Sequence, residues 1–137
     1  MAWLNATPKP PPGSQRAKAA EKSKPLSRRD QMKKDGILPQ MPPNPMPHLI
    51  SFFIEIGMTE STGMGPSPLS WREINEWQHA TRVRLAPWEA RLIRSLSLAY
   101  VAETGKAESE NYPSPIRTEV TAREREVEEA NLRNLLG

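Results

Sequence analysis

Proline is concentrated in the first third of the chain, and this uneven distribution constrains the fold more than any other feature. Ten of the fifteen prolines precede His48, three of them consecutively at positions 10–12. Because proline fixes φ and lacks a backbone N–H, segments dense in proline resist helix formation and favour extended or polyproline II structure. We therefore expect residues 1–46 to form a long, disordered or extended arm, with the folded body beginning at Pro47.

This arm is also basic. Residues 1–47 contain nine Lys or Arg against three Asp or Glu, whereas residues 48–104 contain five against six and residues 105–137 five against seven. A basic segment on a near-neutral body favours contact with an acidic partner or phosphate, and a solvated tail is the alternative interpretation. Within the arm, Ser27 as N-cap and Gly36 as a left-handed C-terminal residue predict a short helix near residues 28–35.

Composition excludes several classes of protein. The chain has no cysteine, so disulfide bonds, thiol nucleophiles and Cys-based metal sites are excluded. Its two histidines, His48 and His79, have no partner at ligand spacing, and we expect no metal and no cofactor. No apolar run approaches the roughly 20 residues needed to cross a bilayer. The N-terminus also lacks a secretory signal, so a soluble, cytoplasmic protein is expected.

Periodicity predicts three helices between residues 47 and 104. Residues 48–56 are apolar almost all round and stop at Gly57, which favours a helix, although a buried strand is the alternative for so short a β-branched run. After a loop over residues 58–69, Ser70 and Glu73 form a capping box for a helix that ends near Arg82. A third helix is predicted from Pro87 to about residue 104.

The last part of the chain, residues 105–137, is expected to be a polar linker followed by an amphipathic helix. Thr121 and Glu124 form a second capping box, and the helix is predicted to run to about Leu136. Its apolar positions form only a narrow stripe, so the helix would be marginal alone in water. The predicted fold class is therefore all-α: a small three- to four-helix domain over residues 47–104, with the arm and this C-terminal helix attached.

Aromatic residues supply the candidate binding sites. A domain of fewer than about 60 residues rarely encloses a sufficient core by itself, yet residues 47–104 contain Trp71, Trp77 and Trp88. The rings either form one small core or leave one exposed as a partner-binding hot spot. Trp3 and Leu4, at the tip of a polar tail, either anchor a partner or fold back on the body. These five residues are the predicted partner-binding residues.

Catalysis and nucleic-acid binding have weaker support. Glu76 and His79 share a helix, but a lone histidine there is more typical of a surface position, and no catalytic residue is assigned. Gly63 and Gly65 are followed by Pro66 rather than by a phosphate-binding Lys-Ser/Thr pair. Residues 71–104 could be taken for a helix-turn-helix, but Glu89 at the start of its second helix would repel phosphate. We expect neither an enzyme nor a nucleic-acid-binding protein.

The pattern of Trp, Pro and Gly positions over residues 40–104 resembles the tail assembly chaperones of long-tailed bacteriophages and prophages. The similarity lies in four blocks: Pro42-Pro43-Asn44-Pro45-Met46-Pro47-His48-Leu49 with Glu55-Ile56-Gly57; Gly63-Met64-Gly65-Pro66-Ser67-Pro68-Leu69-Ser70-Trp71-Arg72-Glu73-Ile74 with Trp77-Gln78; Leu85-Ala86-Pro87-Trp88-Glu89-Ala90-Arg91; and Leu96-Ser97-Leu98-Ala99-Tyr100.

The resemblance implies a non-enzymatic role in the host cytoplasm. Such chaperones coat the helical tape-measure protein and help recruit tail-tube subunits, and they are often a downstream reading frame joined to an upstream one by ribosomal frameshifting. The implied partners are therefore the tape-measure and tail-tube proteins, with self-association left open and no membrane. The alternatives are a structural tail or neck component retained in the virion, and a DNA-binding accessory protein.

Overall fold

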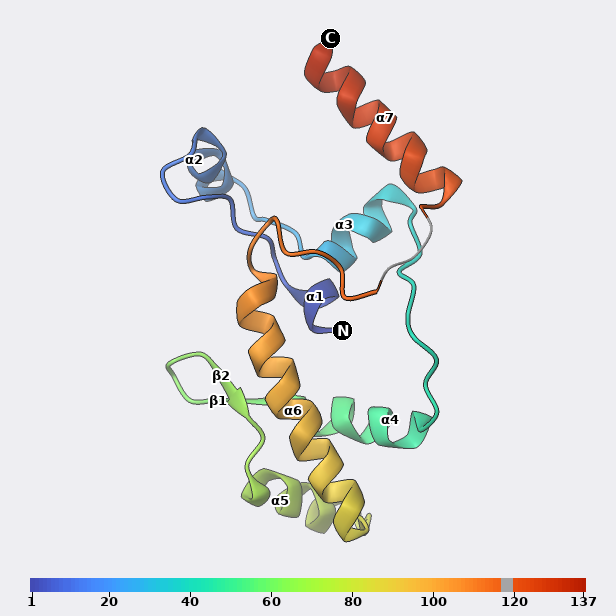
Figure 1. The fold of residues 1–137 in the computed structure, drawn as a ribbon. Helices are drawn as coiled ribbons and strands as arrows, with labels where there is room; N and C mark the ends of the chain where they lie inside the picture. Colours follow the sequence, from blue (N-terminus) through green and yellow to red (C-terminus); the bar gives the residue numbers. More distant parts are fainter. Residues whose placement is uncertain (117–119) are drawn as a thin grey trace. The chain divides into compact units, whose positions relative to one another are not determined.

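The computed structural model describes residues 1–116 and 120–137, and within them the chain is mostly helical (Figure 1). Its elements are α1 (Ala2–Asn5), α2 (Gln15–Lys22), α3 (Arg28–Asp35), α4 (Pro47–Ile56), β1 (Thr59–Ser61), β2 (Pro66–Pro68), α5 (Trp71–Thr81), α6 (Pro87–Ala107) and α7 (Ala122–Leu136). The helical content agrees with the predicted all-α class, to which the structure adds one small hairpin.

The chain forms two compact units. Unit 1 comprises Met1, Trp3–Pro42 and Ala107–Gly137, and unit 2 comprises Ala2 and Pro43–Lys106. The predicted division into an arm, a helical domain and a C-terminal part remains a prediction about which segments fold independently. Unit 2 corresponds closely to the expected helical domain, whereas unit 1 combines sequence from both ends of the chain.

Unit 2 begins with α4, and here the predicted helix is confirmed over the strand alternative. Pro47 occupies its first turn, and Gly57 ends it with a φ of 113°, a left-handed conformation that favours glycine. Leu49 and Phe53, one helical turn apart, are both buried. Phe53 also meets Tyr100 of α6 edge-on, with ring centroids 6.2 Å apart.

A β-hairpin replaces the loop expected over residues 58–69. β1 and β2 pair antiparallel, with Thr59 opposite Pro68. The hairpin is joined to α6 by Ser97, a fully buried side chain whose hydroxyl donates to the carbonyl of Met58 (2.6 Å) and accepts from the N–H of Leu69 (2.8 Å). One hydroxyl thus satisfies a backbone group at each base of the hairpin. A serine among apolar helix positions gives no sequence signal for this role.

The capping box predicted at the start of α5 forms only in part. The Ser70 hydroxyl accepts from the N–H of Glu73 (3.2 Å), as expected. The reciprocal bond is made by another residue, because Glu60 of β1 accepts from the N–H of Ser70 (2.9 Å) and from its hydroxyl. The side-chain hydrogen bond from Ser70, followed by the backbone one, lowers the pKa of Glu60. The carboxylate that accepts from the N–H of Ser70 therefore comes from Glu60 of the hairpin and not, as the local sequence predicts, from Glu73.

Helix α6 is longer than predicted. It continues through Gly105 to Ala107, although a glycine in a helix interior costs about 1 kcal/mol relative to alanine. Ala107 is completely buried, and its carbonyl accepts a hydrogen bond from Arg28. This distant contact stabilises the last turn, which explains why the local stop signal is overridden.

The predicted long, disordered or extended arm is not confirmed. In unit 1, residues 1–42 contain helices α1, α2 and α3 and include the buried residues Leu4, Ala6 and Arg28. The N–H of Lys9 donates to the carbonyl of Glu108 (2.8 Å), so the proline-rich stretch is bound to residues that follow α6. The prolines prevent helix formation only where they occur in the chain. Burial of neighbouring apolar residues such as Leu4 and Ala6 orders the rest of this segment. The short helix predicted from Ser27 to Gly36 is confirmed as α3.

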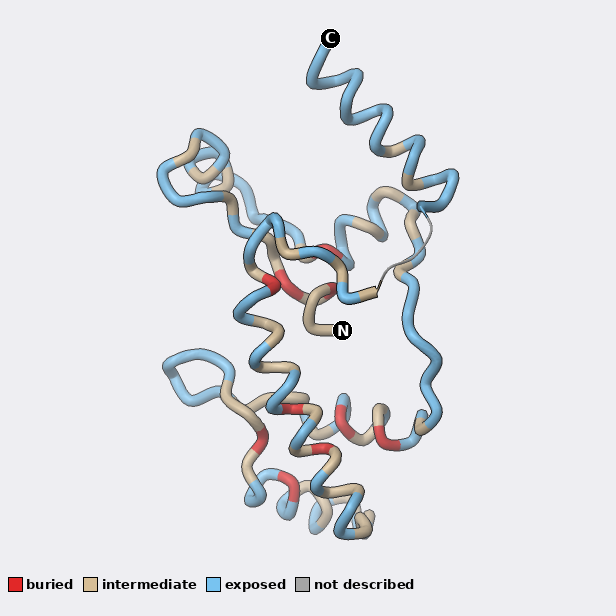
Figure 2. The backbone as a smooth tube through the Cα atoms, in the orientation of Figure 1, coloured by how far each residue is buried: buried red, intermediate tan, exposed pale blue. Residues whose placement is uncertain are grey.

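Helix α7 follows the sequence closely. Thr121 and Glu124 form both bonds of the predicted capping box, and the helix ends at Leu136. No residue of α7 is buried, as its almost uniformly exposed trace shows (Figure 2). Of the helices in the described part of the chain, none combines the length and apolar character needed to cross a membrane.

Candidate partner-binding surface

Trp3 and Leu4 lie within unit 1, so the structure shows the fold-back alternative for this pair. Leu4 is only 6% exposed. The indole N–H of Trp3 donates to the carbonyl of Tyr112 (2.9 Å), and the guanidinium of Arg28 lies 4.7 Å from the centroid of its ring. Both residues therefore hold unit 1 together, and their predicted role in partner binding stays a prediction.

Arg28 organises these contacts, a role that no local sequence pattern predicts. Its guanidinium donates to the carbonyls of Trp3 (3.1 Å), Ala107 and Ser109 (2.8 Å). Burial lowers the pKa of this guanidinium. In the sequence Arg28 is one of several basic residues around α3, and its contacts are visible only once residues about eighty positions away are brought to it.

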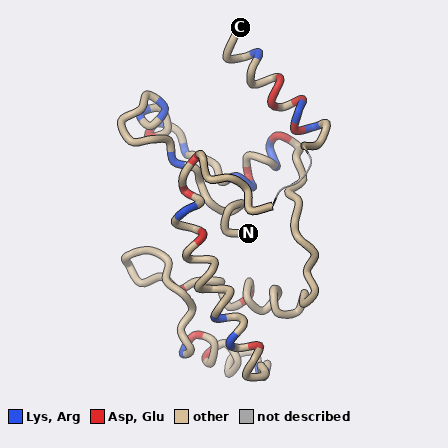
Figure 3. The backbone as a smooth tube through the Cα atoms, in the orientation of Figure 1, with Lys and Arg blue, Asp and Glu red and all other residues tan. Residues whose placement is uncertain are grey.

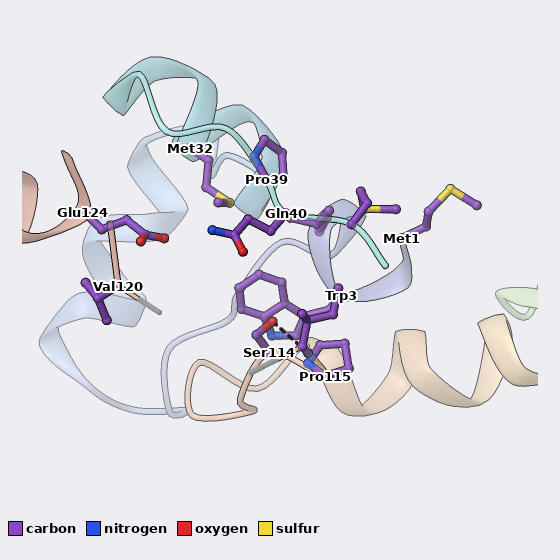
Figure 4. A pocket seen from close by; sticks show the side chains of 12 residues that line it. Met1, Trp3, Met32, Pro39, Gln40, Ser114, Pro115, Val120 and Glu124 are labelled. Carbon is purple, nitrogen blue, oxygen red and sulfur yellow. Dashed lines mark hydrogen bonds between the residues drawn. The ribbon is translucent and has the colours of Figure 1, made fainter. Parts of the chain in front are cut away.

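An apolar hollow of about 340 Å³ lies beside Trp3 in unit 1. Figure 4 shows the indole between Gln40 on one side and Ser114 and Pro115 on the other. Met32 and Met41 also line the hollow. Flexible methionines adapt to irregular apolar surfaces, so the hollow could accommodate an apolar side chain.

The basic residues of unit 1 are partly neutralised within the unit. Lys and Arg positions, coloured blue along the backbone in Figure 3, occur in both α2 and α3. Lys9 pairs with Glu108 (2.7 Å) and Arg16 with Glu110 (3.6 Å). Exposed pairs of this kind contribute little to stability, but they reduce the positive charge available to an external polyanion.

In unit 2 the three tryptophans fall into two groups. Trp77 is half-buried against Phe52, with ring centroids 5.1 Å apart, and its indole N–H has no hydrogen-bond partner among the described residues. Trp71 and Trp88 are 49% and 52% exposed. The guanidinium of Arg94 lies 5.5 Å from the ring centroid of Trp71. Trp77 thus packs against Phe52 within unit 2, whereas Trp71 and Trp88 present aromatic surface to solvent.

Trp88 begins an exposed stripe along α6 that the sequence analysis did not identify. Residues spaced by three or four positions share one face of a helix, and every member of one such set on α6 is exposed. We call this set the α6 stripe: Trp88, Arg91, Ser95, Leu98, Ala99 and Ala102. The opposite face contains the fully buried Ile93 and Ser97. The stripe has large apolar residues at Trp88 and Leu98, a cation at Arg91, small residues at Ser95, Ala99 and Ala102, and no acidic residue.

The described residues contain no cluster of three or more His, Asp or Glu side chains able to hold a metal ion. Neither His48 nor His79 lies in such a group. The exposed surface of unit 2 presents apolar and cationic side chains, among them Trp88, Leu98 and Arg91.

Comparison with known proteins agrees with this character. A family model described as phage tail assembly chaperone matches residues 27–101, more than half of the chain. The match includes α3 of unit 1 and, in unit 2, helices α4 and α5, the hairpin and most of α6. No curated protein and no solved structure shows significant similarity to the chain. On the strength of the family match, the chain belongs to the phage tail assembly chaperone family.

Proposed function

We propose that this protein is a non-catalytic chaperone that binds the tape-measure protein and tail-tube subunits while a phage tail is assembled in the host cytoplasm. The observation that carries the proposal is the exposed aromatic and apolar surface of unit 2, inside the part that matches the family. Trp71 and Trp88 are each about half exposed. Tryptophan and arginine are enriched among interface residues that contribute most to binding energy.

The α6 stripe supports a helical partner. Ser95, Ala99 and Ala102 project little from the helix, so a second helix could approach α6 closely along its second half, with Trp88 and Leu98 as larger apolar contacts. Packing of an amphipathic helix onto such a surface is a recurring mode of recognition. A long helical protein with apolar stripes, as the tape-measure protein is expected to be, fits this surface.

The proposal is tested by affinity capture from cells that produce the phage, with mass spectrometry of purified virions alongside. We expect capture of the tape-measure and tail-tube proteins, and absence of the chaperone from mature particles. A fixed, stoichiometric amount of the chain in virions would contradict a transient role and would identify a structural tail component.

The binding surface is tested with single substitutions. Trp88→Ala is expected to weaken capture of the tape-measure protein at least tenfold, because a hot-spot truncation costs about 2 kcal/mol or more. Met64→Ala is the matched control, since Met64 is an almost fully exposed apolar residue in the hairpin turn of the same unit. Helical circular dichroism should be unchanged in both. Equal capture by the two variants would exclude Trp88 from the interface.

A further inference from the structure

A polar hollow lies where the chain passes from α5 to α6. It has a volume of about 320 Å³ and is lined by Asn75, Gln78, His79, Arg82, Val83 and Arg84. We call it the Arg82 pocket. Its lining includes two arginines and no acidic residue. Neither guanidinium forms an ion pair with a carboxylate among the residues that the structure describes.

The backbone of Arg82 is in a conformation that an arginine rarely adopts. Arg82 ends α5 with a φ of 61°, in the left-handed region, whereas Gly36 and Gly57 occupy the equivalent left-handed positions after α3 and α4. Glycine is the preferred residue there because a Cβ atom is strained in this region. Strained backbone of this kind clusters at binding and active sites. Here it sets the direction in which the Arg82 side chain projects from the end of α5.

The loop that carries the two arginines is held in place by side chains of α5. Gln78 Oε1 accepts from the N–H of Leu85 (2.9 Å). Thr81 Oγ1 donates to the carbonyl of Trp77 (2.8 Å) and accepts from the N–H of Val83 (3.4 Å). These hydrogen bonds order the backbone of the loop on both sides of Arg82 and Arg84. Little backbone conformational entropy therefore remains to be lost on binding.

We infer that the Arg82 pocket binds a carboxylate from an acidic segment of a partner protein. The inference rests on the proposed function and specifies the chemistry that the partner must present. Guanidinium groups bind carboxylates through paired, charge-assisted hydrogen bonds. Asn75 and His79 also line the same space and can donate hydrogen bonds.

The observations favour an acidic protein segment over a nucleic acid. Residues 48–104 contain more acidic than basic residues, and binding to a phosphate backbone requires an extended basic surface. The pocket is instead a single hollow of limited volume. Trp88, half exposed and four residues after Arg84, offers apolar contact close by in sequence. A carboxylate next to an apolar side chain matches this combination.

Nuclear magnetic resonance of the full chain tests the inference. Arginine Nε–H signals and the side-chain signals of Asn75 and His79 would be followed while a short poly-glutamate peptide is added, and a DNA duplex would be added in a parallel titration. We expect saturable shifts confined to the pocket with the peptide. Absence of these shifts, or tighter binding of DNA at the same signals, would overturn the inference.

Substitutions separate charge from backbone strain. The double variant Arg82→Gly/Arg84→Gln is expected to bind the peptide at least tenfold more weakly, with a Tm no lower than that of the unsubstituted protein, because glycine suits the left-handed position. Arg72→Gln removes one positive charge from an exposed position of α5 outside the pocket and is expected to retain binding. An equal loss of peptide affinity in this control would show that binding depends on net charge and not on the pocket, and would overturn the inference.

Capture of tail proteins distinguishes failure of this inference from failure of the proposed function. If the unsubstituted chain captures tail proteins and the double variant captures them equally well, the pocket does not bind the partner, while the proposed function stands. If the unsubstituted chain captures none, the proposed function fails, and the peptide titration alone decides whether the pocket is a carboxylate site.

Discussion

In both units, single buried polar side chains satisfy backbone groups that come from distant parts of the sequence. Arg28 does so for three carbonyl groups in unit 1. Ser97 does so for the N–H of Leu69 and the carbonyl of Met58 in unit 2. An unsatisfied buried backbone group costs about 1–3 kcal/mol, so removing either side chain should cost more than the loss of its own packing.

Arg28→Ala is expected to lower the stability of unit 1 by about 2–4 kcal/mol, since it leaves three carbonyls without their donor and removes the cation above Trp3. Arg28→Lys should recover part of this loss, because a single ammonium cannot reach all three acceptors. Hydrogen exchange at residues 107–112 measures the effect. Arg29→Ala is the control, as Arg29 is exposed; a similar loss in it would show that the buried hydrogen bonds are not the cause.

Among the helices, α6 continues past the end that its local sequence predicts, which is near residue 104. It passes through Gly105, where an added Cβ would meet no atom within 4 Å. The glycine is therefore required neither by a left-handed conformation nor by close packing. Its presence reduces the stability of a helix whose last turn includes the buried Ala107.

Gly105→Ala is expected to raise the free energy of unfolding by about 0.5–1 kcal/mol, through the higher helix propensity of alanine and a less flexible unfolded chain. Gly57→Ala is the matched comparison and should destabilise, because Gly57 has a φ of 113°. Urea unfolding of the two variants measures both effects. Destabilisation by Gly105→Ala would contradict the view that α6 is continuous through this position.

At the scale of the whole molecule, the two units differ in how their residues are distributed along the sequence. Nearly all of unit 2 is one continuous stretch, Pro43–Lys106, whereas unit 1 requires residues from both sides of that stretch. The Pro43–Lys106 stretch can therefore make nearly all contacts of unit 2 without the rest of the chain. Trp3 and Arg28, by contrast, donate to acceptors at Ala107, Ser109 and Tyr112, on the other side of that stretch.

A fragment of residues 43–106 is therefore expected to fold by itself, with a cooperative thermal transition by circular dichroism, although a core of this size supplies only a few kcal/mol. A fragment of residues 1–42 should remain unfolded and should show no protection of the Trp3 indole N–H from exchange. Adding a peptide of residues 107–137 should restore that protection. Protection in the 1–42 fragment alone would contradict the assignment.

The sequence predicted what depends on local contacts. The caps at Ser27, Gly36, Gly57 and Thr121 and the helices that they limit are confirmed, because each involves groups within a few residues of one another. The prediction of a disordered or extended arm over residues 1–46 is not confirmed, because the proline pattern says nothing about Tyr112, which is 109 positions from Trp3. The hairpin was missed for a similar reason, since Ser97 stabilises it from α6.

Of the candidate site, the sequence supplied the residue types and the structure supplied their exposure. Trp71, Trp77 and Trp88 were equivalent as candidates, and burial separates Trp77 from the other two. The Arg82 pocket gave no sequence signal, since an arginine in a left-handed conformation cannot be recognised before the backbone is known.

The pairing of Trp3 with Tyr112 sets an order of events during synthesis on the ribosome. At about 5–20 residues per second, Trp3 and Leu4 wait roughly 5–20 seconds before the acceptor at Tyr112, 109 positions later, has been translated. The last residue of unit 2, Lys106, is translated only six positions before Tyr112, so unit 2 is complete for roughly 0.3–1.2 seconds before that acceptor is available. The nascent chain therefore passes through a brief stage in which Trp3 and Leu4 are still uncovered while the tryptophan-bearing surface of unit 2 can already form, and a partner that is present early would meet that surface first.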